Sequence, residues 1–124
     1  MTEPTRTGAQ APAELSAEDK KLVTLARATR VRAGAAEGAA IRDADGRTYA
    51  GATVDLPSLR LSALQVCLGM AVSSGVKALE AAVLLTEADA PDPADLAALA
   101  ELGGDAVVVH VGTVAGALHS STTA

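Results

Sequence analysis

The stretch LEAAVLLTEADAPDPADLAALAELGGDAVVVHV (residues 79–111) decides the fold, because it places two apolar segments on either side of a helix signal. Residues 79–86 and 105–111 are short and rich in Leu or Val, which is typical of buried strands. Between them, Asp92-Pro93-Ala94-Asp95 has the residue types of a helix start, and Gly103-Gly104 marks its end. Two strands joined by a crossover helix pair in parallel. The stretch therefore predicts an α/β fold.

Two further elements are indicated near the start of the sequence. Ser16-Ala17-Glu18-Asp19 is typical of a helix N-terminus with a capping box, and this helix is expected to end at Gly34. Two strand-like runs, residues 38–42 and 47–55, flank an Asp-Gly turn. Short strands around such a turn predict a β-hairpin.

A second helix is expected to open at Pro57-Ser58 and to run to Ser74. It is apolar almost all round, as in a helix buried in a domain or in an oligomer interface. The order helix, β-hairpin, helix, strand, helix, strand predicts a mixed sheet with helices on its faces. Residues 1–13 are expected to be a disordered tail, residues 14–112 one domain, and residues 113–124 a weak edge strand or a tail.

The composition excludes several classes of function. The 124 residues carry 15 acidic against 10 basic side chains, a net charge of −5, which argues against nucleic acid and anionic membranes as partners. Tyr49 is the one aromatic residue, so a nucleobase has almost nothing to stack on. The single Cys67 excludes an internal disulfide, and no signal segment or membrane-spanning run is present, so we expect a soluble, cytoplasmic protein. A core of Ala, Val and Leu buries little area per residue, which favours a homo-oligomer.

Several short strings occur in an order and spacing that resemble one enzyme family. They are Gly38-Ala39-Ala40, Asp45-Gly46-Arg47, Tyr49-Ala50-Gly51, Leu59 to Gln65, Ala71 to Gly75, and Pro91 to Leu96. Over residues 18–112, the chain is similar to the small homo-oligomeric cytidine deaminases. The resemblance implies a three-layer α-β-α sandwich and a dimer or tetramer whose neighbouring subunits complete each other's pockets.

The same resemblance assigns the chemistry of that family to particular positions. In zinc deaminases, Cys or His and two further Cys hold zinc at two helix N-termini, and a glutamate transfers protons to and from the attacking water. The ligand positions fall on Ser62, Asp92 and Asp95, and the glutamate falls on Leu64. Leucine cannot transfer a proton, serine is a poor zinc ligand, and aspartates prefer hard cations. We therefore predict a divergent member that has no zinc cofactor and no catalytic residue at these positions.

These positions also have purely structural interpretations. Asp92 suits the N-cap of a helix, and Asp95 suits its first turn, where a negative charge faces the positive end of the helix dipole. Ser62 suits a serine inside a buried helix that bonds to its own backbone or lies in an interface. Cys67 suits a packed, inert thiol.

The remaining candidate residues carry weaker expectations. Thr53 and Asp55 fall where the family binds ribose with Asn and Glu, and they retain the hydrogen-bonding groups needed to bind a sugar hydroxyl. His110 and His119 lack metal-ligand spacing to each other and are expected to be structural or solvent-exposed.

Three functions are compatible with this pattern. The leading hypothesis is a non-catalytic module that binds copies of itself, an unidentified protein partner or a nucleoside-like small molecule. The alternative is an active cytidine or nucleoside deaminase with an atypical metal site, in which Glu37 or Asp55 would replace the missing acid. A third hypothesis is a structural subunit of a larger assembly.

Overall fold

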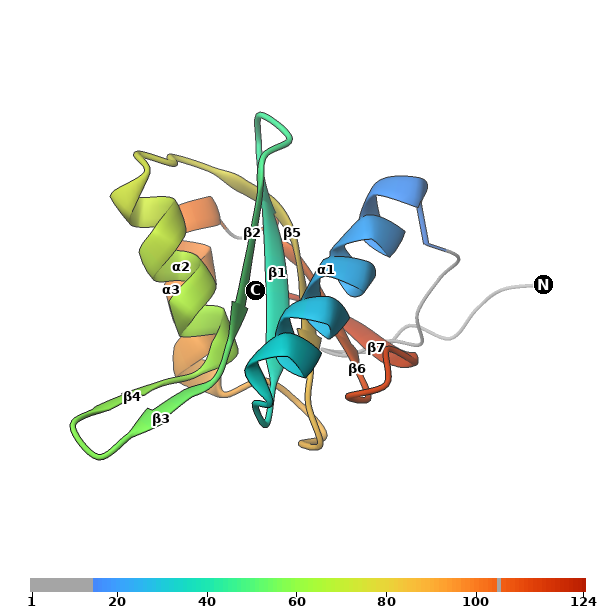
Figure 1. Ribbon diagram of the computed structural model, residues 1–124. Helices are drawn as coiled ribbons and strands as arrows, with labels where there is room; N and C mark the ends of the chain where they lie inside the picture. Colours follow the sequence, from blue (N-terminus) through green and yellow to red (C-terminus); the bar gives the residue numbers. More distant parts are fainter. Residues whose placement is uncertain (1–14, 105) are drawn as a thin grey trace.

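The computed structural model describes residues 15–104 and 106–124 of the chain (Figure 1). In chain order, its elements are α1 (Ala17–Ala33), β1 (Gly38–Asp43), β2 (Thr48–Ala52), β3 (Val54–Leu56), β4 (Leu59–Leu61), α2 (Ala63–Ser73), β5 (Leu79–Leu85), α3 (Pro93–Gly103), β6 (Val108–Gly112) and β7 (Leu118–Thr123). The tail predicted at residues 1–13 lies outside the described residues.

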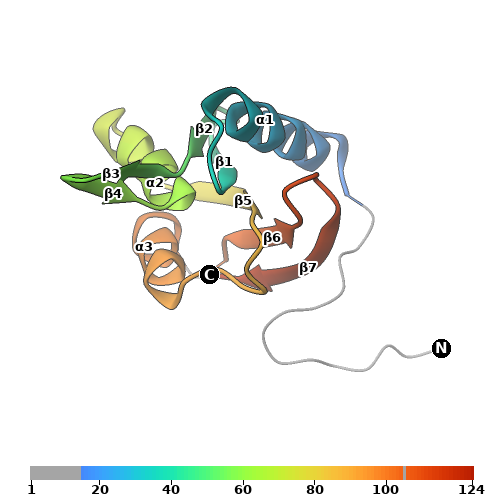
Figure 2. The same ribbon diagram turned by 60° about the horizontal axis from the view of Figure 1, so that its bottom comes forward.

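The described residues form a five-stranded mixed sheet in the order β2-β1-β5-β6-β7, and β3 pairs with β4 in a separate two-stranded ribbon. β5 and β6 are parallel, as the strand–helix–strand stretch predicts, and the other neighbours in the large sheet are antiparallel. The edge strand considered for residues 113–124 is β7. Figures 1 and 2 show α1 on one face of the sheet and α2 with α3 on the other. The predicted α/β class and its three layers are confirmed.

Each face of the sheet covers its own cluster of aliphatic side chains. On the α1 face, the fully buried Leu22 and Ala26 pack with Val83 and Leu85 of β5. The opposite face holds the larger cluster, which includes Leu64, Cys67, Leu99, Val107, Val109 and Val111. Alanines lie among the larger aliphatic side chains in both clusters, and no aromatic residue is among their buried members.

The sequence prediction is wrong about where the second helix begins. Pro57 and Ser58 lie in the turn between β3 and β4, and residues 59–61 form a strand that pairs with β3. The helix begins only at Ala63, after the N-cap residue Ser62. Figure 1 shows the β3–β4 ribbon projecting from the body of the molecule. Its Leu56 and Leu59 are 55% and 48% exposed, so the ribbon carries apolar surface into solvent.

The hairpin between β1 and β2 depends on the buried side chain of Asp43. Its Oδ1 accepts hydrogen bonds from the backbone N–H groups of Asp45 and Arg47, both at 2.9 Å, and its Oδ2 accepts one from the Tyr49 hydroxyl at 3.0 Å. Burial alone would raise the pKa of this carboxyl, but the hydrogen bonds from Arg47, Tyr49 and Asp45 hold its pKa below the usual value. The ionised carboxylate therefore stabilises the turn.

Asp43→Asn should destabilise the protein at neutral pH by an amount that disappears in acid. A carboxyl with a lower pKa in the folded than in the unfolded chain stabilises the fold above its unfolded-state pKa of about 3.9. That contribution is lost as the pH falls through the folded-state pKa. Calorimetric Tm values should therefore differ between wild type and variant at neutral pH, begin to converge below about pH 4, and become equal only below the lowered pKa of Asp43 in the folded protein. A Tm difference that does not change with pH would contradict this role.

α1 approaches the sheet closely at Gly38, the first residue of β1. A Cβ added to Gly38 would overlap the backbone oxygen of Ala26 and would lie 2.7 Å from the Cβ of Arg30. The backbone of α1 therefore rests directly on the backbone of β1, and only glycine fits at this point.

Candidate functional site

The N-termini of α2 and α3 lie at the same end of the sheet, next to the end of β5 (Figure 1). Ser62 immediately precedes α2, and Asp92 immediately precedes α3. The fold therefore brings the positions that the family resemblance assigns to zinc to one end of the molecule, although they are far apart in the sequence.

The sequence suggested that Ser62 lies inside a helix, but it is the N-cap residue that precedes α2. Its Oγ accepts a hydrogen bond from the backbone N–H of Gln65 at 3.1 Å, and Gln65 Oε1 accepts one from the backbone N–H of Ser62 at 2.9 Å. This reciprocal pair is a capping box, which occupies the polar groups at the helix start. The Ser62 hydroxyl is therefore engaged in holding α2.

Asp92 has the corresponding structural role at α3. Its Oδ1 accepts a hydrogen bond from the backbone N–H of Ala94 at 2.8 Å, and Pro93 occupies the first turn, as the sequence predicts. Asp95 lies in the same turn and is only 5% exposed. A carboxylate there is favoured by the positive end of the helix dipole. Asp92 therefore caps α3, and Asp95 lies where a negative charge favours the start of this helix.

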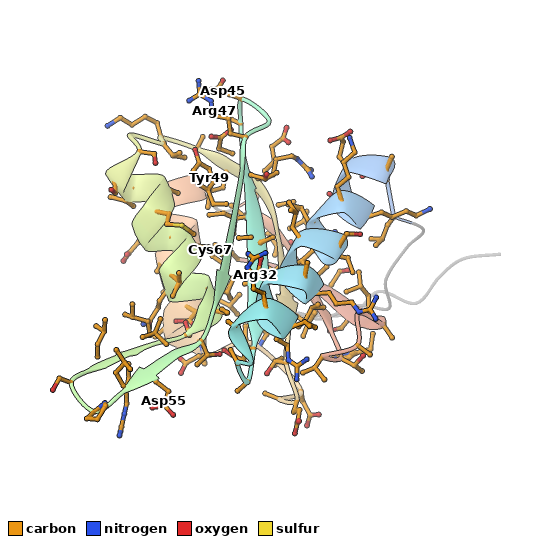
Figure 3. The ribbon with its side chains drawn as sticks, in the orientation of Figure 1. Arg32, Asp45, Arg47, Tyr49, Asp55 and Cys67 are labelled. Atoms are coloured by element: carbon orange, nitrogen blue, oxygen red, sulfur yellow. The ribbon has the colours of Figure 1, made fainter. Side chains whose placement is uncertain are left out.

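The side chains on the inner face of α2 offer no proton carrier. Leu64 is fully buried within the core cluster. Cys67 is also fully buried, and Figure 3 shows it on α2 beside the sheet. Burial raises the pKa of its thiol to about 12, so the thiol keeps its proton and is neither a nucleophile nor a metal ligand at neutral pH.

The donor groups at the two helix starts do not fit a zinc ion. Structural and catalytic zinc sites in proteins use thiolates and imidazoles above all, whereas this end of the sheet offers one hydroxyl and two carboxylates. Within residues 15–104 and 106–124, no group of three His, Cys, Asp or Glu side chains is placed to hold a metal ion. Ser62, Asp92 and Asp95 therefore do not form the ligand set of a zinc site.

Thr53, one of the predicted ligand-binding residues, is used to join strands at this same end. Its Oγ1 accepts a hydrogen bond from the backbone N–H of Glu37 at 2.9 Å, and the Glu37 carboxylate accepts one from the Thr86 hydroxyl at 2.9 Å. Thr86 follows β5 and is 4% exposed. Sequence reasoning named Glu37 only as a substitute acid and missed this network, which links the ends of β1, β2 and β5.

Asp55, the other predicted ligand-binding residue, lies away from this network. Figure 3 shows it on the β3–β4 ribbon, out from the helices. Its side chain is 78% exposed and forms an ion pair with Arg60 at 3.3 Å. Thr53 and Asp55 therefore face different surroundings.

The structure also reveals a polar cluster that sequence reasoning did not find. His110 of β6 is 7% exposed and contacts the side chains of Ser121 on β7 and Asp19 on α1. The only signal in the sequence was a histidine within a run of valines, which places His110 on the opposite face of the strand from Val109 and Val111. His119, in contrast, is exposed, as expected.

The outer surface of α2 and α3 is hollowed by an apolar groove of about 580 Å³, lined by Leu68, Gly69, Val72, Ser73, Ala98, Glu101 and Leu102. Val72 is 60% exposed, and Met70, also on α2, is 37% exposed. The helix that the sequence predicts to be apolar all round is therefore buried on one side only. Among the described residues, no helix is both long and apolar enough to cross a bilayer.

Comparisons with known proteins agree with this architecture. The Cytidine deaminase-like family model matches residues 15–116 of the chain. The solved structure of cytidine deaminase from Burkholderia pseudomallei is 23% identical with a TM-score of 0.72, and the match covers 83% of this chain and 91% of that chain. For cytidine deaminase from Mycobacterium leprae, the identity is 22%, the TM-score 0.66 and the coverage 87% and 94%. For the Mycobacterium tuberculosis enzyme, these values are 24%, 0.65, 76% and 85%. No curated protein matches the sequence.

Proposed function

Because the chain belongs to the cytidine deaminase-like family, we propose that it is a member that has lost deaminase chemistry and uses the fold as an interaction module. The observation that carries this proposal is the state of the two helix starts. Ser62 and Asp92, at the positions of metal ligands, each cap a helix through hydrogen bonds of 3.1 and 2.8 Å. Side-chain capping has taken the place of the metal in holding α2 and α3.

The position of the proton-transferring glutamate supports the same proposal. Leu64 occupies this position. Its apolar side chain is fully buried in the core cluster, where it contributes to packing. Glu37, which the sequence suggested as a substitute acid, is hydrogen-bonded to Thr86. General acid–base catalysis needs a group that both takes and gives a proton beside the reacting atoms. Neither residue is free for that role.

A second copy of the chain is the partner that the surface supports best. The groove on α2 and α3 is apolar, Val72 is 60% exposed beside it, and the ribbon exposes Leu56 and Leu59. Exposed apolar patches of this kind mark interaction sites, and a small core without large rings gains stability from such contacts. A nucleoside-like ligand has less support, because Thr53 is bonded to Glu37 and Asp55 points into solvent.

An active deaminase with an atypical metal site is the second candidate. The observation in its favour is Asp95, a carboxylate that is 5% exposed at the start of α3. Zinc content and cytidine turnover separate the two candidates, because only an active deaminase requires a bound metal and converts cytidine.

Zinc content and cytidine turnover should be measured on one sample of untagged protein, purified after growth in zinc-supplemented medium. We expect zinc well below one ion per subunit by elemental analysis, and no conversion of cytidine to uridine above the uncatalysed rate. Sedimentation velocity on the same sample should show a dimer or a tetramer. Zinc near one per subunit, or conversion of cytidine at an enzyme-like rate, would contradict the proposed loss of deaminase chemistry. A monomer at all concentrations would remove self-association from the proposed function.

A further inference from the structure

The side chains of Ser121, His110 and Asp19 form a hydrogen-bonded row on the α1 face of the sheet. Ser121 lies directly opposite His110 across the β7–β6 pair. The Ser121 Oγ is 2.7 Å from His110 Nδ1, and His110 Nε2 is 3.0 Å from Asp19 Oδ2. A hydroxyl, an imidazole and a carboxylate in this order are the parts of an activated nucleophile, with the base oriented by a third group.

The chemistry of the three groups fixes which of them donates. An ionised carboxylate can only accept, so the Nε2 of His110 carries the hydrogen that is donated to Asp19. In the neutral imidazole, Nδ1 then has a free lone pair and accepts the hydroxyl hydrogen of Ser121. This is the tautomer that a general base requires. Compared with the serine proteases, the two ring nitrogens have exchanged roles.

The Asp19 carboxylate that contacts His110 is also held by a basic side chain. Arg42 Nη1 lies 2.9 Å from Asp19 Oδ1 in an ion pair that lacks the alignment of a hydrogen bond, and Arg42 Nε donates to Glu80 at 2.7 Å. This ion pair fixes the Asp19 carboxylate that contacts His110 Nε2.

The backbone of Ser121 adds a donor beside its hydroxyl. Ala124 donates its backbone N–H to the oxygen of Val107 at 2.9 Å. In an antiparallel pair of strands, opposite residues alternate between hydrogen-bonded and non-hydrogen-bonded pairs. If Val107 and Ala124 are a hydrogen-bonded pair, the register makes His110 and Ser121 a non-hydrogen-bonded pair. β7 is the last strand of the described sheet, so the N–H of Ser121 points toward its open edge. An N–H in this place can stabilise an oxyanion that forms next to Oγ.

We propose that Ser121 is a nucleophile that accepts an acyl group from an ester or thioester, with His110 as its base and Asp19 orienting the imidazole. The Oγ–carbon bond forms as the acyl–oxygen or acyl–sulfur bond breaks. The hydroxyl proton passes to His110 Nδ1 and from there to the leaving alkoxide or thiolate. Water then attacks the acyl-serine through the same base, which releases the carboxylic acid and returns a proton to Ser121.

Diisopropyl fluorophosphate tests this site, because its reaction replaces the P–F bond with a bond to the activated oxygen and releases fluoride. We expect one adduct, located on Ser121 by peptide mass spectrometry, that forms at least about 100-fold faster in the folded protein than in urea. His110→Gln should slow labelling by about 100-fold or more, and Ser121→Ala should abolish it. Prior labelling should also abolish hydrolysis of p-nitrophenyl acetate by the wild-type protein.

Ser120→Ala is the matched control, because Ser120 is the next residue on β7, is also half-buried, and lies opposite Val111. This variant should be labelled at the wild-type rate. The comparison of folded with urea-unfolded wild type needs no variant, so the test survives if His110→Gln fails to fold. Absence of an adduct on Ser121, equal rates in folded and unfolded protein, or a folded His110→Gln variant that is labelled normally would overturn the proposal.

Discussion

Gly38→Val should lower the free energy of unfolding by more than about 3 kcal/mol, beyond the usual range for an overpacked site. A Cβ at this position overlaps the backbone oxygen of Ala26, and a backbone atom in a helix cannot move aside as a side chain does. Relief would require α1 to move away from β1, which would open the cluster under Leu22 and Val83. Small domains are stable by only about 5–15 kcal/mol, so much of the fold's stability is at stake. Urea denaturation followed by circular dichroism measures the loss.

Gly69→Ala is the control for this experiment. Gly69 lies within α2, and a Cβ added there meets nothing within 4 Å. Alanine costs less backbone entropy than glycine in a helix, so this variant should be more stable than wild type by about 0.5–1 kcal/mol. If Gly38→Val were as stable as Gly69→Ala, α1 would not rest on β1 as described.

The triple variant Ser62→Cys/Asp92→Cys/Asp95→Cys should bind zinc at close to one ion per subunit. The three positions lie at the N-termini of α2 and α3, where the helix dipoles favour thiolates over thiols. Three thiolates and a water complete a tetrahedral zinc site. Elemental analysis after dialysis measures the zinc, and the wild type provides the baseline.

The same variant should remain unable to deaminate cytidine, because Leu64 is unchanged and no group transfers protons there. Metal without turnover would thus separate the effect of the three proposed ligand positions from the effect of Leu64 at the proposed position of the acid. The matched control is Asp92→Cys/Asp95→Cys, which keeps the Ser62 cap and should bind zinc more weakly. A triple variant without zinc would show that the three positions do not converge, and that the assignment of family positions to this chain is wrong.

The parts of the fold that depend on local signals were predictable from the sequence. The start of α3 followed from Asp92 and Pro93, which act on the residues next to them. The parallel pairing of β5 with β6 followed from two apolar runs joined by a helix. In both cases, the physical cause lies within a short stretch of chain.

The prediction failed where two local signals competed. Pro57 suits the first turn of a helix as well as a β-turn, and Ser62 with Gln65 is an equally good helix start a few residues later. What decides between them is the pairing of β3 with β4, which no single residue reveals. The residue at which the second helix begins therefore had to come from the structure.

The Asp19–His110–Ser121 row was out of reach for a different reason. Asp19 and His110 are separated by 91 positions in the chain, and the contact of Ser121 with His110 depends on the register of β7. A histidine in a valine-rich strand indicates a buried polar group but does not name its partners. Sequence patterns give periodicity, whereas this cluster depends on how α1 lies across the sheet.

The buried thiol of Cys67 makes the protein a convenient object for site-specific labelling. It is the single cysteine of the chain, it is fully closed off from solvent, and its pKa is raised to about 12. Thiolates attack maleimide reagents, so Cys67 should not react with them while the protein is folded. A cysteine introduced at Ser58, in the turn of the projecting ribbon, would then take up a spin label or a fluorophore alone. Distances between labels on two subunits would report the symmetry of an assembly without any change to the native thiol.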